Sequence, residues 1–181
     1  MNTASYALGS PPIGSLAQGS LFSIYGSDMG PEPSVRAGFY PLPSTLGGVS
    51  VQIVRGLERY DAYLIFVSSG QINAILPSNV PVGDALAVVS YNGRTSQPVS
   101  IQVVQSSLGI FFQRVGGRDF AIAQNYNSAS DYPLNLPDTP AKPDQIVILW
   151  GTGLGPVTLA DNRPPGATGD MVGGRGRDDH R

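Results

Sequence analysis

Short apolar runs with a period of two residues, separated by glycine and proline, constrain the fold of this chain most strongly. In residues 49–54, valine and isoleucine alternate with serine and glutamine, and residues 99–104 repeat the pattern. Such alternation places the apolar side chains on one face of a β-strand. The 23 Gly and 16 Pro residues punctuate the runs, and no apolar stripe of helical period extends over ten residues. The pattern predicts an all-β chain.

The spacing of these runs predicts an architecture as well as a class. Asn92-Gly93 is typical of a type I′ hairpin turn, in which both central residues need positive φ. Seven or so short strands with closely spaced turns favour a Greek-key β-sandwich of immunoglobulin type. The further strands expected before residue 105 cover 19–27, 62–67, 71–77 and 85–91.

Four segments follow from this pattern. Residues 1–19, rich in Ser, Gly, Pro and Ala, are predicted to be a flexible leader, and residues 20–105 the sandwich. Residues 106–160 are expected to form a second β segment that packs on the sandwich or continues it. Residues 161–181 have almost no apolar content and are predicted to be a disordered tail. If this tail replaces strands of the second β segment, the sheet of that segment is incomplete and has an unpaired edge.

Composition excludes several classes of function. The net charge is −2 and Lys142 is the only lysine, so there is no basic face to bind nucleic acid. No apolar run approaches the ~20 residues that span a bilayer. The chain has no cysteine, which excludes disulfides, thiolate nucleophiles and thiolate metal sites. The first residues contain no recognisable signal peptide.

No set of residues predicts catalysis. His180, the only histidine, is one residue from the end, where an imidazole is not held against a nucleophile. Lys142 lies in a Pro-flanked loop, and Glu58 and Asp61 flank a turn where they are expected to be solvated. The catalytic residues are therefore unknown.

One loop offers ligands for a cation. It contributes oxygen donors of the kind that calcium binds, with backbone carbonyls in addition. The spacing fits no known calcium motif, and asparagine, aspartate and proline also favour turns for conformational reasons. A calcium site and a turn-rich loop both remain open. The candidate ligands are Asn127, Asp131, Asn135, Asp138 and Asp144.

Tyrosine is the commonest aromatic residue, with eight Tyr against six Phe and one Trp. Exposed tyrosines stack on sugars or anchor protein partners. Tyr60 and Tyr63, at one junction between a turn and a strand, are the candidate partner-binding pair; packing at the end of a sheet is the alternative.

Five motifs in one order carry a family resemblance, and they are residues 43–51, 70–73 with 76–77, 92–93 with 96–98, 108–111, and 141–144 with 152–156. The chain resembles an uncharacterised C-terminal domain family of large secreted proteins from Solibacter-type acidobacteria, over about residues 19–160. The resemblance implies an extracellular location and an immunoglobulin-like β architecture, and it supplies no catalytic residues. The chain departs from the family after about Val157, where the polar tail replaces a continuing β module.

The leading hypothesis is a non-catalytic extracellular bacterial module that acts as a spacer or presents loops to a protein or glycan partner. One alternative is a small calcium-dependent hydrolase of esters or lactones, in which the cation activates water without histidine. Another is a self-associating structural unit, a homo-oligomer formed through an exposed sheet edge.

Overall fold

Strand β5 (Val49–Arg55) shows how the alternating pattern builds the fold. Val49, Val51 and Ile53 are fully buried, whereas Ser50 and Gln52 between them are partly exposed. One face of the strand therefore lies on a core and the other faces outward, as the sequence predicts. The computed structural model describes residue 4 and residues 15–164, and the description that follows refers to these residues.

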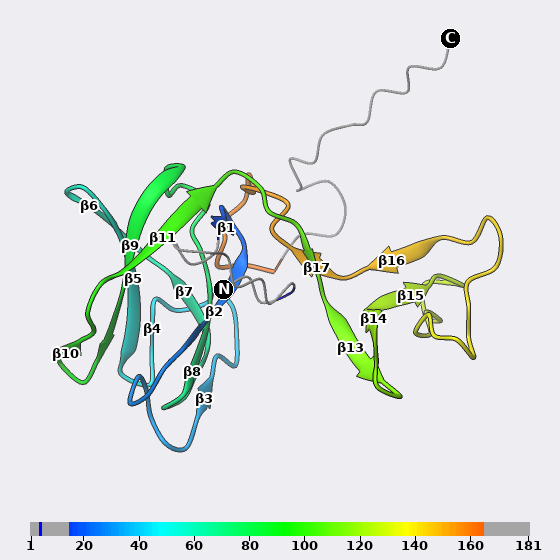
Figure 1. The fold of residues 1–181 in the computed structure, drawn as a ribbon, viewed down its shortest axis with the longest axis horizontal. Coiled ribbons are helices and arrows are strands. Elements are labelled where there is room, and N and C mark those ends of the chain that lie inside the picture. The colour runs from blue at the N-terminus through cyan, green and yellow to red at the C-terminus, as the bar shows by residue number, and fades with distance from the viewer. Residues whose placement is uncertain (1–3, 5–14, 165–181) are drawn as a thin grey trace, which may run out of the picture.

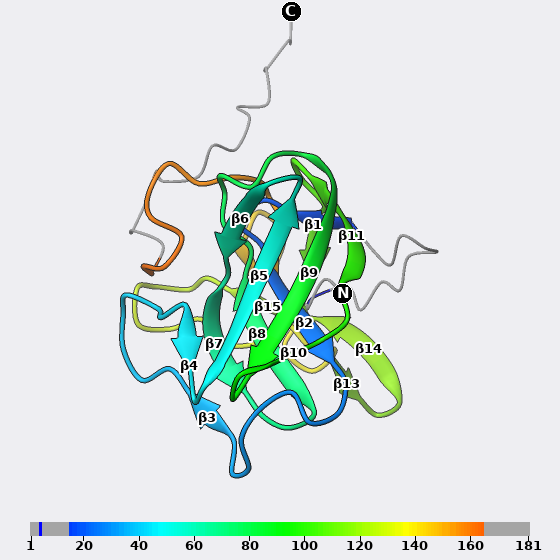
Figure 2. The ribbon, with the colours of Figure 1, turned by 90° about the vertical axis from the view of Figure 1, so that its left-hand side faces the viewer.

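The chain is all-β, which confirms the predicted fold class. Two sheets pack face to face as a sandwich, seen edge-on in Figure 1 and face-on in Figure 2. The smaller sheet has the order β2 (Leu21–Tyr25), β8 (Gln71–Ile75), β7 (Tyr63–Val67), β3 (Val35–Arg36). The larger has the order β1 (Ser15–Ala17), β11 (Val99–Val104), β9 (Gly83–Tyr91), β5, β4 (Thr45–Leu46), with β6 (Glu58–Asp61) paired to β5 and β10 (Arg94–Thr95) paired to β9.

The core lies between these two sheets and is built from both. β2, β7 and β8 contribute Phe22, Leu64 and Ile72, each at most 1% exposed, and they meet the buried residues of β5. The buried cluster draws its residues from positions 16 to 103. The sandwich therefore contains the main hydrophobic core of the described chain, and this core supplies most of its stability.

Hairpin geometry explains how the larger sheet is connected. Asn92 and Gly93 have φ values of 48° and 76°, which confirms the turn expected of an Asn-Gly pair. The chain returns as β10, which pairs with β9 for two residues, and the register then shifts before β11. Pro98, which cannot donate a ladder hydrogen bond, lies in this irregular stretch.

Two polar or short strands were not expected from the sequence. β1 lies within the segment assigned to the leader and pairs in parallel with β11, so the sandwich begins before residue 20. β6 consists of Glu-Arg-Tyr-Asp, which has no apolar alternation, and it forms because it pairs with β5 through the turn at Gly56 and Leu57. The described residues form no helix that is long and apolar enough to cross a bilayer.

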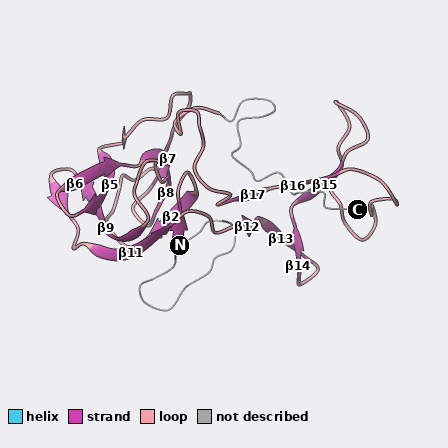
Figure 3. Cartoon of the chain, turned by 90° about the horizontal axis from the view of Figure 1, so that it is seen from above, coloured by secondary structure: helices cyan, strands magenta, loops and turns pink. Residues whose placement is uncertain are grey.

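After β11 the chain leaves the sandwich and forms a separate group of ribbons, which we call the arm (residues 106–154). The arm extends from one end of the sandwich (Figures 1 and 3). It contains three pairings, each of two strands: β12 (Gly109–Ile110) with β17 (Gly151–Thr152), β13 (Phe112–Val115) with β14 (Arg118–Ala121), and β15 (Ala123–Asn125) with β16 (Val147–Leu149).

The three ribbons of the arm diverge from a single backbone junction. Phe111 N–H donates to the carbonyl of Trp150 (2.8 Å), Trp150 N–H donates to Ile122 (3.0 Å), and Ile122 N–H donates back to Phe111 (2.6 Å). At this closed ring of hydrogen bonds the chain passes from one two-stranded pairing of the arm to the next. The arm is thus held by backbone pairing rather than by a core of its own.

Hydrogen bonds from side chains and backbone hold the described end of the chain to the sandwich. The carboxylate of Asp161 accepts hydrogen bonds from the backbone N–H and the hydroxyl of Ser78, and Leu42 N–H donates to the carbonyl of Asn162. Residues 161–164, which were assigned to the tail, therefore lie against the sandwich. The rest of the predicted tail, His180 included, is outside the described residues.

Candidate functional site

The arm exposes an unusual number of large apolar side chains. Only Ala123 among its hydrophobic residues is buried, which contrasts with the closed core of the sandwich. Scattered exposed apolar residues are normal, but a concentration on one element marks an interaction surface. The exposed residues are Leu108, Phe112, Val115, Tyr126, Tyr132, Leu134, Ile146, Val147, Leu149, Trp150 and Leu154.

β16 combines exposed side chains with an open edge. Its inner edge pairs with β15, where Ile148 lies opposite Gln124. At the two ends of this pairing, Tyr126 N–H donates to the carbonyl of Ile146 and Trp150 N–H donates to the carbonyl of Ile122. In an antiparallel ladder alternate residues face the partner, so the N–H and C=O groups of Val147 and Leu149 point away from β15. Within the described chain no hydrogen bond to these groups is found. β16 is therefore an edge strand with free backbone groups.

The opposite edge of this small sheet is occupied. Asn125 N–H donates to the carbonyl of Pro133 and Asn135 N–H donates to Ala123, each at 2.8 Å. β15 is thus central, between the segment 133–135 and β16. The sheet can grow only on the β16 side, which is the upper edge of the arm in Figure 1.

Both faces of β16 and its flanks are apolar. Val147 and Leu149 lie on one face, 37% and 59% exposed, and Ile146 and Trp150 on the other, 65% and 52% exposed. Trp150 is oriented by its indole N–H, which donates to Gln124 Oε1 (2.7 Å), while Gln124 Nε2 donates to the carbonyl of Tyr132 (2.9 Å). The strand is therefore positioned before any partner arrives.

The loop predicted to bind calcium is ordered by its own hydrogen bonds. Asn127 Nδ2 donates to Asp131 Oδ2 (2.9 Å), and Gln145 Nε2 donates to Asn127 Oδ1 (2.6 Å). Asp144 has a φ of 62°, the left-handed conformation that aspartate tolerates in turns. In the part of the chain that the structure describes, no three His, Cys, Asp or Glu side chains gather as metal ligands. The contacts seen at Asn127 and Asp131 are those of a turn, and the calcium site, with Asn135 and Asp138, stays a prediction.

Asn125 links β15 to this loop. It is 4% exposed, and its Nδ2 donates to the carbonyl of Thr139 (2.7 Å). Its Oδ1 is buried without a hydrogen-bond partner among the described residues. Because an unpaired buried acceptor costs free energy, this site weakens the arm.

The two candidate tyrosines lie in different sheets, since the chain crosses from β6 to β7 at the buried Ala62. Tyr60 packs against the core, and its hydroxyl donates to Glu58 Oε2 (2.7 Å). This hydrogen bond raises the pKa of the Tyr60 phenol above its usual value. Tyr63 is half-buried in β7 opposite Ile75. Packing accounts for Tyr60, and a partner-binding role for the pair stays a prediction.

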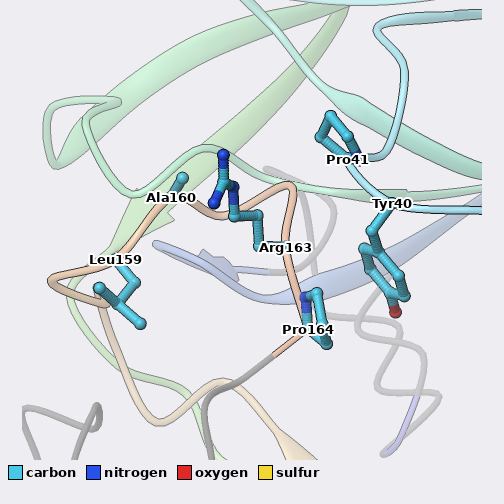
Figure 4. Close-up of a pocket in the computed structure, with 6 residues that line it drawn as sticks. All are labelled: Tyr40, Pro41, Leu159, Ala160, Arg163 and Pro164. Carbon is cyan, nitrogen blue, oxygen red and sulfur yellow. The ribbon is translucent and has the colours of Figure 1, made fainter.

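Two hollows on the sandwich are further candidates. A groove of about 480 Å³ opens between β2 and the strands β9 and β11, with apolar walls that include Phe22, Ile24 and Val99. A shallow depression of about 740 Å³ lies between Tyr40 and Pro41 on one side and Leu159 and Arg163 on the other (Figure 4). Among the described residues, neither lining includes a carboxylate, a histidine or a lysine, and each includes one tyrosine, Tyr25 and Tyr40 respectively.

Comparison with known proteins finds no matching family model, no similar curated protein and no similar solved structure. The fold and the exposed arm are therefore the observations on which a function has to be based.

The sequence indicated this surface only in part. Residues 145–150 are a strongly apolar run within the segment expected to be β-structure, and β16 forms in this run. The pattern of this run does not indicate its exposure, because a continuous apolar run without alternation is typical of a buried strand. The exposed role of Trp150 was missed for the same reason.

Proposed function

We propose that this chain is a non-catalytic extracellular module that docks an extended segment of a protein partner. The sandwich is the scaffold and the arm is the docking element. The observation that carries the proposal is the open edge of β16, where free backbone groups and apolar side chains coincide. Addition of a strand to such an edge gives main-chain hydrogen bonds for affinity and alternate side chains for specificity.

Strand order supports an immunoglobulin-like sandwich as the scaffold. One sheet has β2 next to β8 and β8 next to β7, and the other has β5, β9 and β11 side by side. The same neighbour order is found for strands B-E-D in one sheet and C-F-G in the other sheet of an immunoglobulin fold. A chain without cysteine does not depend on a reducing compartment, so its composition is compatible with an extracellular location. The family resemblance implies the same location. We propose both on these grounds.

A polypeptide fits this surface better than a glycan. Sugar sites need polar groups beside the aromatic ring, to satisfy hydroxyl groups. The indole N–H of Trp150 is already used by Gln124, and its neighbours in the strand are aliphatic. A partner strand satisfies the free N–H and C=O groups of Val147 and Leu149, which a sugar does not match in spacing.

Trp150 makes the proposal testable, because it is the only tryptophan of the chain and lies in the arm. We expect a peptide that alternates Val and Thr to shift the Trp150 emission to shorter wavelength, saturably, as the half-exposed ring is covered. The titration is run at the lowest protein concentration that the signal allows. A peptide of the same composition with a central proline, which cannot form the ladder, is the control.

Matched variants locate the binding. Leu149→Lys introduces a charge at the docking edge and is expected to weaken peptide binding roughly tenfold or more. Leu57→Lys makes the same change at a fully exposed leucine in the turn between β5 and β6, and is expected to leave binding unchanged. Equal binding by both variants, or saturation by an oligosaccharide with no response to the peptide, would contradict the proposal.

No observation on the described residues favours the calcium-dependent hydrolase over this function. Its distinguishing measurement is chelator-sensitive turnover of an ester or lactone, lost in Asp138→Ala. Self-association is consistent with the same edge and is developed below.

A further inference from the structure

The sequence of the docking edge is compatible with a copy of itself. Residues 145–150 carry no charge, and the nearest charged residues are Lys142 and Asp144 on one side. Like charges placed opposite one another are the usual obstacle to pairing between identical strands. When two copies align antiparallel with Ile148 facing its own counterpart, Asp144 falls opposite Thr152, so no like charges meet. Natural edge strands are commonly protected by lysine, proline or a bulge, and β16 has none of these.

One register pairs the free groups of β16 only with one another. With Ile148 on the twofold axis, Val147 of one copy faces Leu149 of the other, and the reverse holds by symmetry. These are the two residues whose N–H and C=O groups point outward, so every free group of β16 becomes paired. A shift by two residues would place Leu149 opposite Gln145, whose N–H already donates to the carbonyl of Lys142. The hydrogen-bond pattern therefore disfavours this shift, and the register centred on Ile148 is the one in which both partner residues of each pair belong to β16.

The side chains agree with this register. On one face Leu149 meets Val147 of the second copy, and on the other Trp150 meets Ile146 of the second copy. Aromatic and β-branched residues are favourable cross-strand partners. All four are exposed in the single chain.

We propose that β16 pairs antiparallel with β16 of a second copy of this chain, so that the two arms form one continuous sheet about a twofold axis at Ile148. The proposal rests on the proposed function, since it identifies the partner strand as the chain's own. A twofold contact of this kind is closed and yields a dimer rather than a fibre.

The contact is small, which sets its expected strength. Four apolar side chains and a short strand from each copy cover on the order of 1,000 Å² in total, near the lower limit for specific complexes. We therefore expect a dissociation constant on the order of 10–100 μM. Analytical ultracentrifugation across this range should show a monomer–dimer equilibrium.

A cysteine cross-link tests the register directly. In the proposed dimer the two Ile148 residues form a pair without mutual hydrogen bonds, in which Cα atoms lie about 4.5 Å apart, within the range of a disulfide. Because the chain has no other cysteine, Ile148→Cys should yield a covalent dimer on mild oxidation. Leu57→Cys, at an exposed position far from the arm in sequence and structure, should remain monomeric at the same concentration.

Charge and proline variants test the edge without a cross-link. Leu149→Lys should raise the dimer dissociation constant roughly tenfold or more, and Leu57→Lys should not. Leu149→Pro removes the outward N–H and the leucine side chain but none of the N–H groups that point toward β15, so it should weaken the dimer while the bond from Trp150 to Ile122 persists. Far-UV circular dichroism of each variant verifies that the sandwich is folded.

The outcomes separate this proposal from the proposed function. A chain that stays monomeric to millimolar concentration, but whose Trp150 responds to the strand-forming peptide, overturns the dimer and leaves the docking function intact. A dimer that survives Leu149→Lys and does not cross-link through Ile148→Cys overturns the register, because its interface lies elsewhere. A chain that binds neither peptide nor copy overturns both. The expected result is cross-linking through Ile148→Cys, together with a monomer–dimer equilibrium that Leu149→Lys shifts toward the monomer.

Discussion

Single side chains determine how the arm is held, and the pair Arg114 and Asp119 is the clearest case. Arg114 Nε and Nη2 donate to the two carboxylate oxygens of Asp119 at 2.7 and 2.9 Å, across the hairpin of β13 and β14. These hydrogen bonds hold the pKa of Asp119 below its usual value. Both side chains are exposed, so the pair is screened by salt and contributes little to stability.

The pH dependence of the hairpin follows from the sign of this shift. Because the pKa of Asp119 is lower in the folded than in the unfolded chain, the stabilisation is present above the unfolded pKa. It is lost as the pH falls through the folded pKa. We expect an NMR titration of the Asp119 carboxyl to give a depressed pKa that returns toward the ordinary value in Arg114→Gln. Arg118→Gln, in the same hairpin, should leave the depression in place. An ordinary pKa in the unmodified chain would show that the hairpin pair is not formed in solution.

At the scale of elements, close backbone approach at one glycine limits how β12 and β17 can pair. A Cβ on Gly151 would lie 2.6 Å from the carbonyl oxygen of Gly109 and 3.2 Å from Ile110 Cδ1. The backbone oxygen cannot move aside without separating the two strands. The position therefore requires glycine for space, although its φ is not in the left-handed region.

Gly151→Ala should loosen the arm and spare the sandwich. We expect a cost of about 1–3 kcal/mol, as for other overpacked sites, expressed as faster hydrogen exchange in β12, β15 and β16. Gly38→Ala is the matched control, since its added Cβ meets nothing within 4 Å. Unchanged exchange in the arm of Gly151→Ala would mean that the β12–β17 pairing is not required there.

The strands that the sequence predicted and those that it missed differ in what stabilises them. β5, β9 and β11 bury an alternating apolar face, and that periodicity is visible in the residues themselves. β6 has no such face and exists through its register with β5. β1 was assigned to the leader on the composition of residues 1–19. Its three residues are too few to show a period, and its pairing with β11 joins residues far apart in the sequence. Local pattern does not encode such pairings.

The molecule as a whole divides into a part with a core and a part without one. The buried cluster ends at Val103, and the arm adds only Ala123, Asn125 and two glycines, Gly109 and Gly153, to the buried residues. Small β-ribbons without a shared core are marginal on their own. The arm therefore belongs to the low end of the range of local stabilities in this protein.

Denaturation should accordingly occur in two steps. Trp150 fluorescence reports the arm alone, whereas far-UV circular dichroism is dominated by the sandwich. We expect the fluorescence transition at lower denaturant than the circular-dichroism transition, since the arm opens first. The gap should narrow as protein concentration rises, because dimerisation stabilises the arm by mass action. Coincident transitions at every concentration would indicate that arm and sandwich unfold as one unit.

The sequence by itself determined the fold class, the main strands of the sandwich and the Asn92-Gly93 turn, because periodicity and turn propensity are local properties. It also predicted that the region after residue 105 continues as β-structure, with an unpaired edge if the polar tail replaces strands. Only the tertiary structure decided which strand carries that edge. Whether residues 145–150 are buried or exposed depends on whether another layer covers them, and coverage comes from segments distant in the sequence. In the described chain nothing covers them, which turns an ordinary apolar strand into the proposed docking edge.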